Sequence, residues 1–230
     1  MTALVPKTAS ARACAVILLA FAVLAAWYSV AIPLGEAVDE IPHFDYVRYV
    51  TMYHALPIQP WRDNGQPWSV TMGHHPPLYY ALAGASSSWI DTSDYDAVVK
   101  PNPHFDWLEN DFHNGAAVQL HSSAEDFPYH GTVLALHVLR ALSILMGLVT
   151  LVAVYRIARL TVPSLPWVAV AATAIIAFNP SFIFMSASIQ NDPLMTMLFS
   201  LSLWWIVHAL DVFPSTNALV VGGRCSAQRR

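Results

Sequence analysis

The chain has 230 residues, of which 56% are hydrophobic and only 11% are charged, and its formal net charge is -4. A soluble domain of this length typically carries about 25% charged residues, so the composition argues against an ordinary soluble fold. No basic face is present of the kind that nucleic acid requires, and no nucleic-acid partner is expected. The two cysteines, Cys14 and Cys225, indicate neither a disulfide framework nor a Cys-based metal site.

The first apolar run, residues 13–33, follows Lys7 and Arg12. Its length is close to the ~20 residues that cross a bilayer. A cleaved signal peptide is the rival interpretation, but its apolar part usually has only about 7–15 residues. We therefore expect an uncleaved transmembrane helix, with residues 1–12 in the cytoplasm.

Three more apolar runs, at residues 137–160, 167–186 and 193–210, predict three further transmembrane helices. Seven of the 11 Lys and Arg residues fall on one side of the membrane if each run crosses once, and the positive-inside rule makes this side cytoplasmic. They are Lys7, Arg12, Arg156, Arg159, Arg224, Arg229 and Arg230. The tail, residues 211–230, is then cytoplasmic, and the predicted location is the plasma (cell) membrane, in multi-pass form with a cytoplasmic N-terminus.

Residues 34–136 form a large polar loop on the extracytoplasmic side, where most acidic residues and histidines gather. Helical spacing after Leu34 and the prolines Pro76 and Pro77 predict two short interfacial helices in this loop. The short loop SIQNDP, between the third and fourth runs, lies on the same side. The expected fold class is an all-α integral membrane protein of about four transmembrane helices.

The adjacent carboxylates Asp39 and Glu40 come just after the first helix. Neighbouring residues on a helix point in different directions, so one carboxylate could accept a proton while the other orients a partner. The alternative is a charged helix start, where acidic side chains favour the helix dipole. His43 lies one turn further on, and a carboxylate with a histidine at this spacing could contribute to a metal site. No complete ligand set is recognisable, so no metal site is assigned.

Several other polar residues of the outer face have two interpretations. His74 and His75 could bind a metal or a phosphate, or lie at the interface as polar residues. Arg140, at the outer edge of the second helix, could bind an anionic phosphate or reach lipid headgroups. Asn191 and Asp192 could face a site or cap the fourth helix.

Taken in order, these segments resemble the GT-C fold glycosyltransferases that use polyprenyl-phosphate sugars, such as protein O-mannosyltransferases and the lipid A aminoarabinose transferase. The resemblance covers most of residues 13–210. It rests first on the pair Asp39-Glu40, with His43, Tyr46 and Arg48 downstream. The segment HHPPLYYALAG resembles the family's KPPLxYW or QPPLYY segment. The other two matching features are Leu139-Arg140 and the segment NPSFIFMSASIQNDPL.

The resemblance implies an enzyme that transfers a sugar, with inversion, from a lipid-linked donor in the membrane to an acceptor on the extracytoplasmic face. Asp39 would be the general base and Glu40 its supporting acid. The residues expected to bind substrate are His43, His74, His75, Tyr79, Arg140, Asn191 and Asp192. Some family members use a divalent cation and others do not, so the resemblance implies no certain cofactor.

The family usually has more membrane helices than this chain, and the ending STNALVVGGRCSAQRR is unlike a continuing bundle. We therefore expect a truncated chain or a fragment, whose oligomeric state the sequence leaves open. The alternative function is a non-catalytic membrane protein whose loop binds a glycan, a partner or a metal. Four loop tryptophans would suit sugar stacking, namely Trp61, Trp68, Trp89 and Trp107.

Overall fold

The computed structural model describes residues 7–57, 72–105 and 116–212. Within these ranges the regular structure is helical, and the one sheet-like feature is an isolated bridge between Pro101 and Gln119. The all-α fold class is confirmed for the described residues. Trp61, Trp68, Trp107 and the tail from residue 213 onward lie outside these ranges.

Three helices are long and apolar enough to cross a membrane: α1 (Lys7–Ala31), α5 (Gly131–Thr161) and α8 (Asp192–Val212). A fourth span results if α6 (Pro166–Ala177) and α7 (Pro180–Ser186) are counted together. These two helices are bent by 66° relative to each other, where one transmembrane helix was expected over residues 167–186. The described part of the chain therefore has three or four candidate spans.

Asn179 and Pro180 cause the bend between α6 and α7. Proline lacks the backbone N–H that would continue the hydrogen bonds of α6, and it is well accommodated at the start of a new helix. The Asn179 side chain accepts a hydrogen bond from the Ser181 N–H (2.9 Å) and caps α7. The break is therefore encoded locally.

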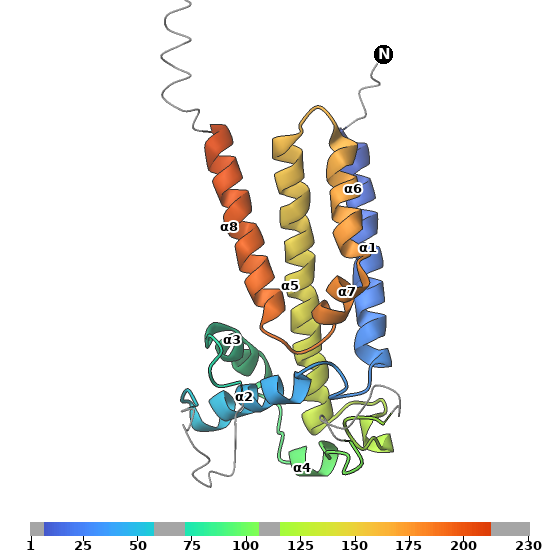
Figure 1. The fold of residues 1–230 in the computed structure, drawn as a ribbon, viewed down its shortest axis with the longest axis vertical. Coiled ribbons are helices and arrows are strands. Elements are labelled where there is room, and N and C mark those ends of the chain that lie inside the picture. The colour runs from blue at the N-terminus through green and yellow to red at the C-terminus, as the bar shows by residue number, and fades with distance from the viewer. Residues whose placement is uncertain (1–6, 58–71, 106–115, 213–230) are drawn as a thin grey trace, which may run out of the picture.

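The central helix of the bundle is α5, which packs against α1, α6, α7 and α8 (Figure 1). Gly147 allows the close approach of its neighbours, since a Cβ there would lie 2.8 Å from Ser186 Oγ and 3.0 Å from the Phe21 ring. At its first turn, Thr132 donates through N–H (2.9 Å) and Oγ1 (2.7 Å) to Asp94. Because Asp94 caps this first turn, α5 begins at Gly131, before the apolar run that starts at residue 137.

Four short helices gather at one end of the bundle, which we call the loop end (Figure 1). They are α2 (Glu40–Tyr53), α3 (Leu78–Ser87), α4 (Tyr95–Val98) and the 3-10 helix η1 (Ser123–Glu125). Helix α3 packs against both α2 and α5. Their shared core is aromatic and aliphatic, and includes Phe44, Tyr46, Val47, Tyr79, Tyr80, Leu136 and Leu139. The two short helices expected in the polar loop correspond to α2 and α3.

Candidate functional site

Glu40 and Arg140 form an ion pair in which both side chains are completely buried. Arg140 donates from Nε to Glu40 Oε1 (2.7 Å) and from Nη2 to Oε2 (2.6 Å). Two parallel bonds of this kind match the planar guanidinium to the carboxylate and fix the relative orientation of both groups. The pair joins the first residue of α2 to the middle of the loop-end half of α5.

The remaining donors of Arg140 bind the carbonyls that end α1. Nη1 donates to the carbonyls of Ser29 (2.5 Å) and Ile32 (2.8 Å), and Nη2 donates to that of Pro33 (3.2 Å). The last carbonyls of a helix have no partner within it, so these bonds satisfy groups that burial would otherwise penalise. All five N–H donors of a guanidinium are thus used within the protein. A phosphate could bind Arg140 only by displacing one of these acceptors.

The Glu40 carboxylate also accepts two backbone hydrogen bonds. Its Oε2 receives the Gly35 N–H (2.9 Å), and its Oε1 receives the Ile189 N–H (3.2 Å) from the segment before α8. The pair with Arg140 therefore connects four segments: the end of α1, the start of α2, α5 and the approach to α8. This environment suits a group that holds these segments together.

Asp39 differs from its neighbour Glu40 in exposure and in hydrogen bonding. Its side chain is exposed and forms no capping hydrogen bond to α2. Its backbone has φ 56° and ψ 15°, a left-handed conformation that aspartate tolerates better than most residues. The residue before it, Val38, is held through its carbonyl by Gln190 Nε2 (2.8 Å). Anchored residues on both sides thus present the Asp39 carboxylate to solvent.

A cluster of histidine and tyrosine rings lies one helical turn further along α2. Tyr80 Oη is 2.7 Å from His43 Nδ1 and 3.1 Å from His75 Nδ1. The ring of Tyr46 stacks on Tyr80 with centroids 3.6 Å apart, and the His74 ring lies edge-on to His75 at 4.3 Å. Burial, and to a smaller extent the charges of His75 and His74, lower the pKa of His43 to about 4. His43 is therefore neutral at neutral pH.

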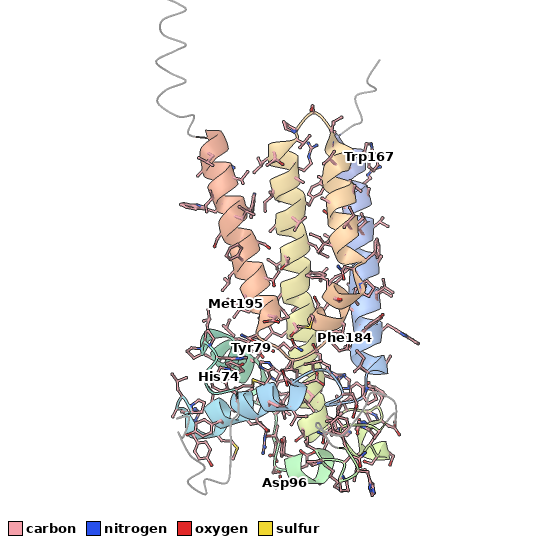
Figure 2. The ribbon with its side chains drawn as sticks, viewed as in Figure 1. His74, Tyr79, Asp96, Trp167, Phe184 and Met195 are labelled. Carbon is pink, nitrogen blue, oxygen red and sulfur yellow. The ribbon has the colours of Figure 1, made fainter. Side chains whose placement is uncertain are left out.

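Asp192, in the first turn of α8, influences this cluster electrostatically. Burial raises the pKa of Tyr80, and the phenols of Tyr79 and Tyr46 and the Asp192 carboxylate add to the effect. Asp192 itself is exposed, and Asn191 precedes it, accepting a backbone hydrogen bond from the Met195 N–H (3.1 Å). Figure 2 shows His74 and Tyr79 at the loop end, where α8 begins, and Trp167 at the opposite end.

A cavity of about 270 Å³ opens between α5, α7 and α8, directly beside Asp192. Its walls combine small hydroxyl groups with apolar side chains, which suits a chain-like ligand more than a strongly charged one. The lining residues are Gly147, Thr150, Ser181, Phe182, Met185, Ser186, Asp192, Pro193, Met195 and Thr196. The polar end of the cavity therefore lies at the loop end, and its remainder extends along the bundle.

The structure thus divides the nine residues predicted to form the site. The exposed or half-buried side chains at the loop end are those of Asp39, His74, His75, Asn191 and Asp192. Tyr79, by contrast, is only 1% exposed and belongs to the core, and burial raises its pKa. Glu40 and Arg140 are buried in their own pair, and His43 is buried behind Tyr80.

Sequence reasoning missed a second polar network, next to the end of α1. His121 lies between Glu125 (Nδ1 to Oε1, 2.9 Å) and Glu36 (Nε2 to Oε1, 3.0 Å). Burial lowers its pKa, but the bonds to these two carboxylates outweigh burial, so the pKa of His121 is raised. The spacing of His121 and Glu125 on one turn was the available signal. Among the described residues no group of three His, Cys, Asp or Glu side chains is arranged to hold a metal ion.

Comparison with known proteins gives one match. Residues 134–223 match the family model described as dolichyl-phosphate-mannose-protein mannosyltransferase, and neither a curated protein nor a solved structure matches the chain. The matched segment is less than half of the chain; it includes Arg140 and Asp192 but neither Asp39 nor Glu40. Together with the apolar helices, this similarity supports a multi-pass membrane protein related, at family level, to membrane glycosyltransferases.

Proposed function

We propose that this chain is a membrane glycosyltransferase that moves a sugar from a polyprenyl-phosphate carrier to an acceptor on the extracytoplasmic face. The main observation is the contrast between two adjacent carboxylates. Glu40 is locked in a buried ion pair, whereas Asp39 is exposed and uncapped between two anchored residues. A carboxylate that is held in place and has no side-chain partner among the described residues is suited to accept a proton from a bound nucleophile.

In this proposal Asp39 is the catalytic base. It removes the proton from the acceptor hydroxyl or amine while the oxygen or nitrogen of that group attacks the anomeric carbon of the donor sugar. The bond between the anomeric carbon and the phosphate oxygen breaks, and its electron pair leaves with the lipid phosphate. Glu40 takes a positioning role instead of a proton-transfer role, because it already accepts hydrogen bonds from Arg140, Gly35 and Ile189.

The cavity between α5, α7 and α8 is the proposed site for the first units of the lipid chain. Its volume of about 270 Å³ lies among helices that are long and apolar enough to span a membrane, and Asp192 marks its loop end. A lipid in this cavity would place its phosphate near His74 and His75, whose imidazoles are suitable donors. The donor would thereby lie near the segment that carries Asp39, since Gln190 binds the Val38 carbonyl.

The orientation is part of the proposal. The positive-inside rule puts the ends of α1 and α5 that carry Arg12 and Arg156 in the cytoplasm. The loop end then faces the outside of the cell, on the same side as the lipid phosphate of an extracytoplasmic donor.

The test is transfer of radiolabelled sugar from polyprenyl-phosphate donors in membranes that contain the chain, beside Asp39→Asn. The matched control is Asp96→Asn, because Asp96 is an exposed aspartate of the same loop region, labelled in Figure 2 at the edge of the loop end. We expect Asp39→Asn to reduce turnover at least 100-fold, as loss of a general base does, and Asp96→Asn to retain it. Donor binding without turnover in the unmodified chain would instead indicate the non-catalytic glycan-binding alternative.

A further inference from the structure

Two arginines lie near the end of α5 that is opposite the loop end, which we call the arginine end. Arg156 and Arg159 are three residues apart in α5, so their side chains lie on the same side of the helix. Trp167, an exposed residue at the start of α6, lies at the same end of the bundle (Figure 2). Exposed tryptophans are enriched at the membrane–water interface. The two guanidinium groups therefore lie near the level of the lipid headgroups.

A positive charge at this end has two general explanations. Basic side chains interact favourably with the C-terminal end of a helix, and the cytoplasmic ends of membrane helices are rich in Lys and Arg. Both explanations predict a side chain whose charged group extends into water. Arg159 differs, because its Nη1 is shielded from solvent and has no hydrogen-bond partner in the part of the chain that the structure describes. A buried donor without an acceptor is costly, so this nitrogen indicates a ligand.

The charges around the two arginines favour an anionic ligand. Among the described side chains, no carboxylate forms an ion pair with Arg156 or Arg159, and the ion pairs that do form use Glu36, Glu40 and Glu125 of the loop end. Two guanidinium groups on one side of a helix can each donate two parallel hydrogen bonds to phosphate oxygens. The arginine end is therefore suited to bind a phosphate.

An apolar stripe of α5 continues from the arginines toward the middle of the bundle. Leu145, Val149 and Val152 are exposed and follow one another at steps of four and three residues, and Arg156 is the next step of four. This spacing places all four side chains on one side of the helix. A charged group at one end of an exposed apolar stripe matches a ligand with a phosphate and hydrocarbon chains.

We propose that Arg156 and Arg159 bind the phosphate of an anionic phospholipid in the leaflet at the arginine end. Arg159 donates a hydrogen bond from Nη1 to a phosphate oxygen, and Arg156 adds a second positive charge. One acyl chain lies along the stripe formed by Leu145, Val149 and Val152. This site lies at the opposite end of the bundle from Asp39, so the inference does not depend on the proposed sugar transfer.

A third arginine at the same end provides a matched control. Ser10 and Cys14 of α1 are buried, and Ser10 Oγ lies 3.2 Å from Tyr155 Oη of α5, so this side of α1 faces α5. Arg12 is exposed and lies two residues from each of them, which places it roughly 200° around α1. Arg12 therefore carries the same charge at the same end of the bundle but points away from α5.

The experiment titrates phosphatidylglycerol into zwitterionic micelles that contain the full chain, and follows thermal unfolding by tryptophan fluorescence. A lipid that binds the folded chain raises the unfolding temperature until the site is saturated. Phosphatidylcholine, which has no net charge, and glycerol 3-phosphate, which has no acyl chains, are the ligand controls. The variants are Arg159→Gln, Arg159→Lys and the control Arg12→Gln. Native mass spectrometry of the unmodified chain measures the retained phosphatidylglycerol directly and needs no variant.

We expect the unmodified chain to show a saturable rise with phosphatidylglycerol and to retain this lipid in preference to phosphatidylcholine. Arg159→Gln should bind it roughly tenfold more weakly, the size of one lost charge-assisted hydrogen bond. Arg159→Lys should also bind more weakly than the unmodified chain, because lysine keeps the charge but lacks the planar guanidinium. Arg12→Gln should bind within about twofold of it, because a charge on the far side of a helix, about 10 Å away, is largely screened at physiological ionic strength.

Three results would overturn the proposal. Equal losses in Arg12→Gln and Arg159→Gln would mean that the lipid responds to the general positive charge of this end and occupies no site. Full binding by Arg159→Lys would mean that the buried Nη1 makes no bond to the phosphate. An equal rise with glycerol 3-phosphate, or no preferential retention of phosphatidylglycerol by the unmodified chain, would exclude a phospholipid as the ligand.

Discussion

Removing either partner of the buried Glu40–Arg140 pair should strongly destabilise the loop end of the bundle. Both side chains are completely shielded from solvent, so a lone survivor would be a buried, uncompensated charge. Breaking such a pair by removing one partner typically costs about 3–5 kcal/mol. We therefore expect Glu40→Gln to lower the free energy of unfolding by this amount, about half of the stability of a typical domain.

The double variant Glu40→Leu with Arg140→Met separates the ion pair from the backbone bonds around it. Replacing both charges with apolar groups is often neutral or stabilising. Here it would also remove partners from three carbonyls at the end of α1 and from the N–H groups of Gly35 and Ile189. Each buried group left unsatisfied costs about 1–3 kcal/mol. The double variant should therefore remain at least as unstable as Glu40→Gln.

The assay is reversible denaturation in mixed micelles, followed by tryptophan fluorescence. Arg156→Gln is the matched control, since Arg156 lies on the same helix α5 but is exposed, and it should change the free energy of unfolding by less than about 1 kcal/mol. A double variant as stable as the unmodified chain would refute the role of the backbone bonds. A Glu40→Gln variant within about 1 kcal/mol of it would refute the role of the pair.

Two further predictions concern stability. The hydrogen bonds of His121 to Glu125 and Glu36 raise its pKa, so their stabilisation is complete below the unfolded pKa of about 6.5 and is lost as pH rises through the folded value. His121→Gln should remove this pH dependence, worth less than about 1 kcal/mol, from thermal unfolding curves, whereas the exposed control His104→Gln should preserve it. Gly147→Ala should lower the free energy of unfolding by about 1–3 kcal/mol in the same micelle assay, because its Cβ would lie 2.8 Å from a side-chain oxygen of α7. An unchanged value would show that α7 can shift away from α5.

Sequence periodicity and length predicted an all-α chain with long apolar helices, because these properties depend on local composition. The positions of α1, α5 and α8 follow from long apolar runs, and the bend between α6 and α7 has a local signal in Asn179-Pro180. The start of α5 could not be predicted in this way. It depends on Asp94, which caps Thr132 from 38 residues away. A contact between residues this far apart in the chain cannot be recognised from the local sequence pattern.

The site shows the same division between local and distant information. The sequence indicated that the two adjacent carboxylates point in different directions and could take different roles. The structure gives Asp39 and Glu40 different exposures. The partner of Glu40 is Arg140, 100 residues away. Sequence reasoning offered an anionic phosphate or the lipid headgroups as the partner of that arginine. Likewise the segment HHPPLYY suggested donors to phosphate, but the hydrogen bond between Tyr80 and His43 depends on the packing of α3 against α2.

The two carboxylates can be understood together through the backbone of Asp39. A left-handed conformation in a residue other than glycine costs roughly 1–2 kcal/mol and persists only where the surroundings enforce it. Here the Val38 carbonyl is bound by Gln190 on one side, and Glu40 is bound by Arg140 on the other. The strain is therefore sustained by the same contacts that join α1, α2, α5 and the approach to α8. It follows that a change at Arg140 should reduce both stability and transfer, whereas Asp39→Asn should reduce transfer alone, since asparagine tolerates the same backbone.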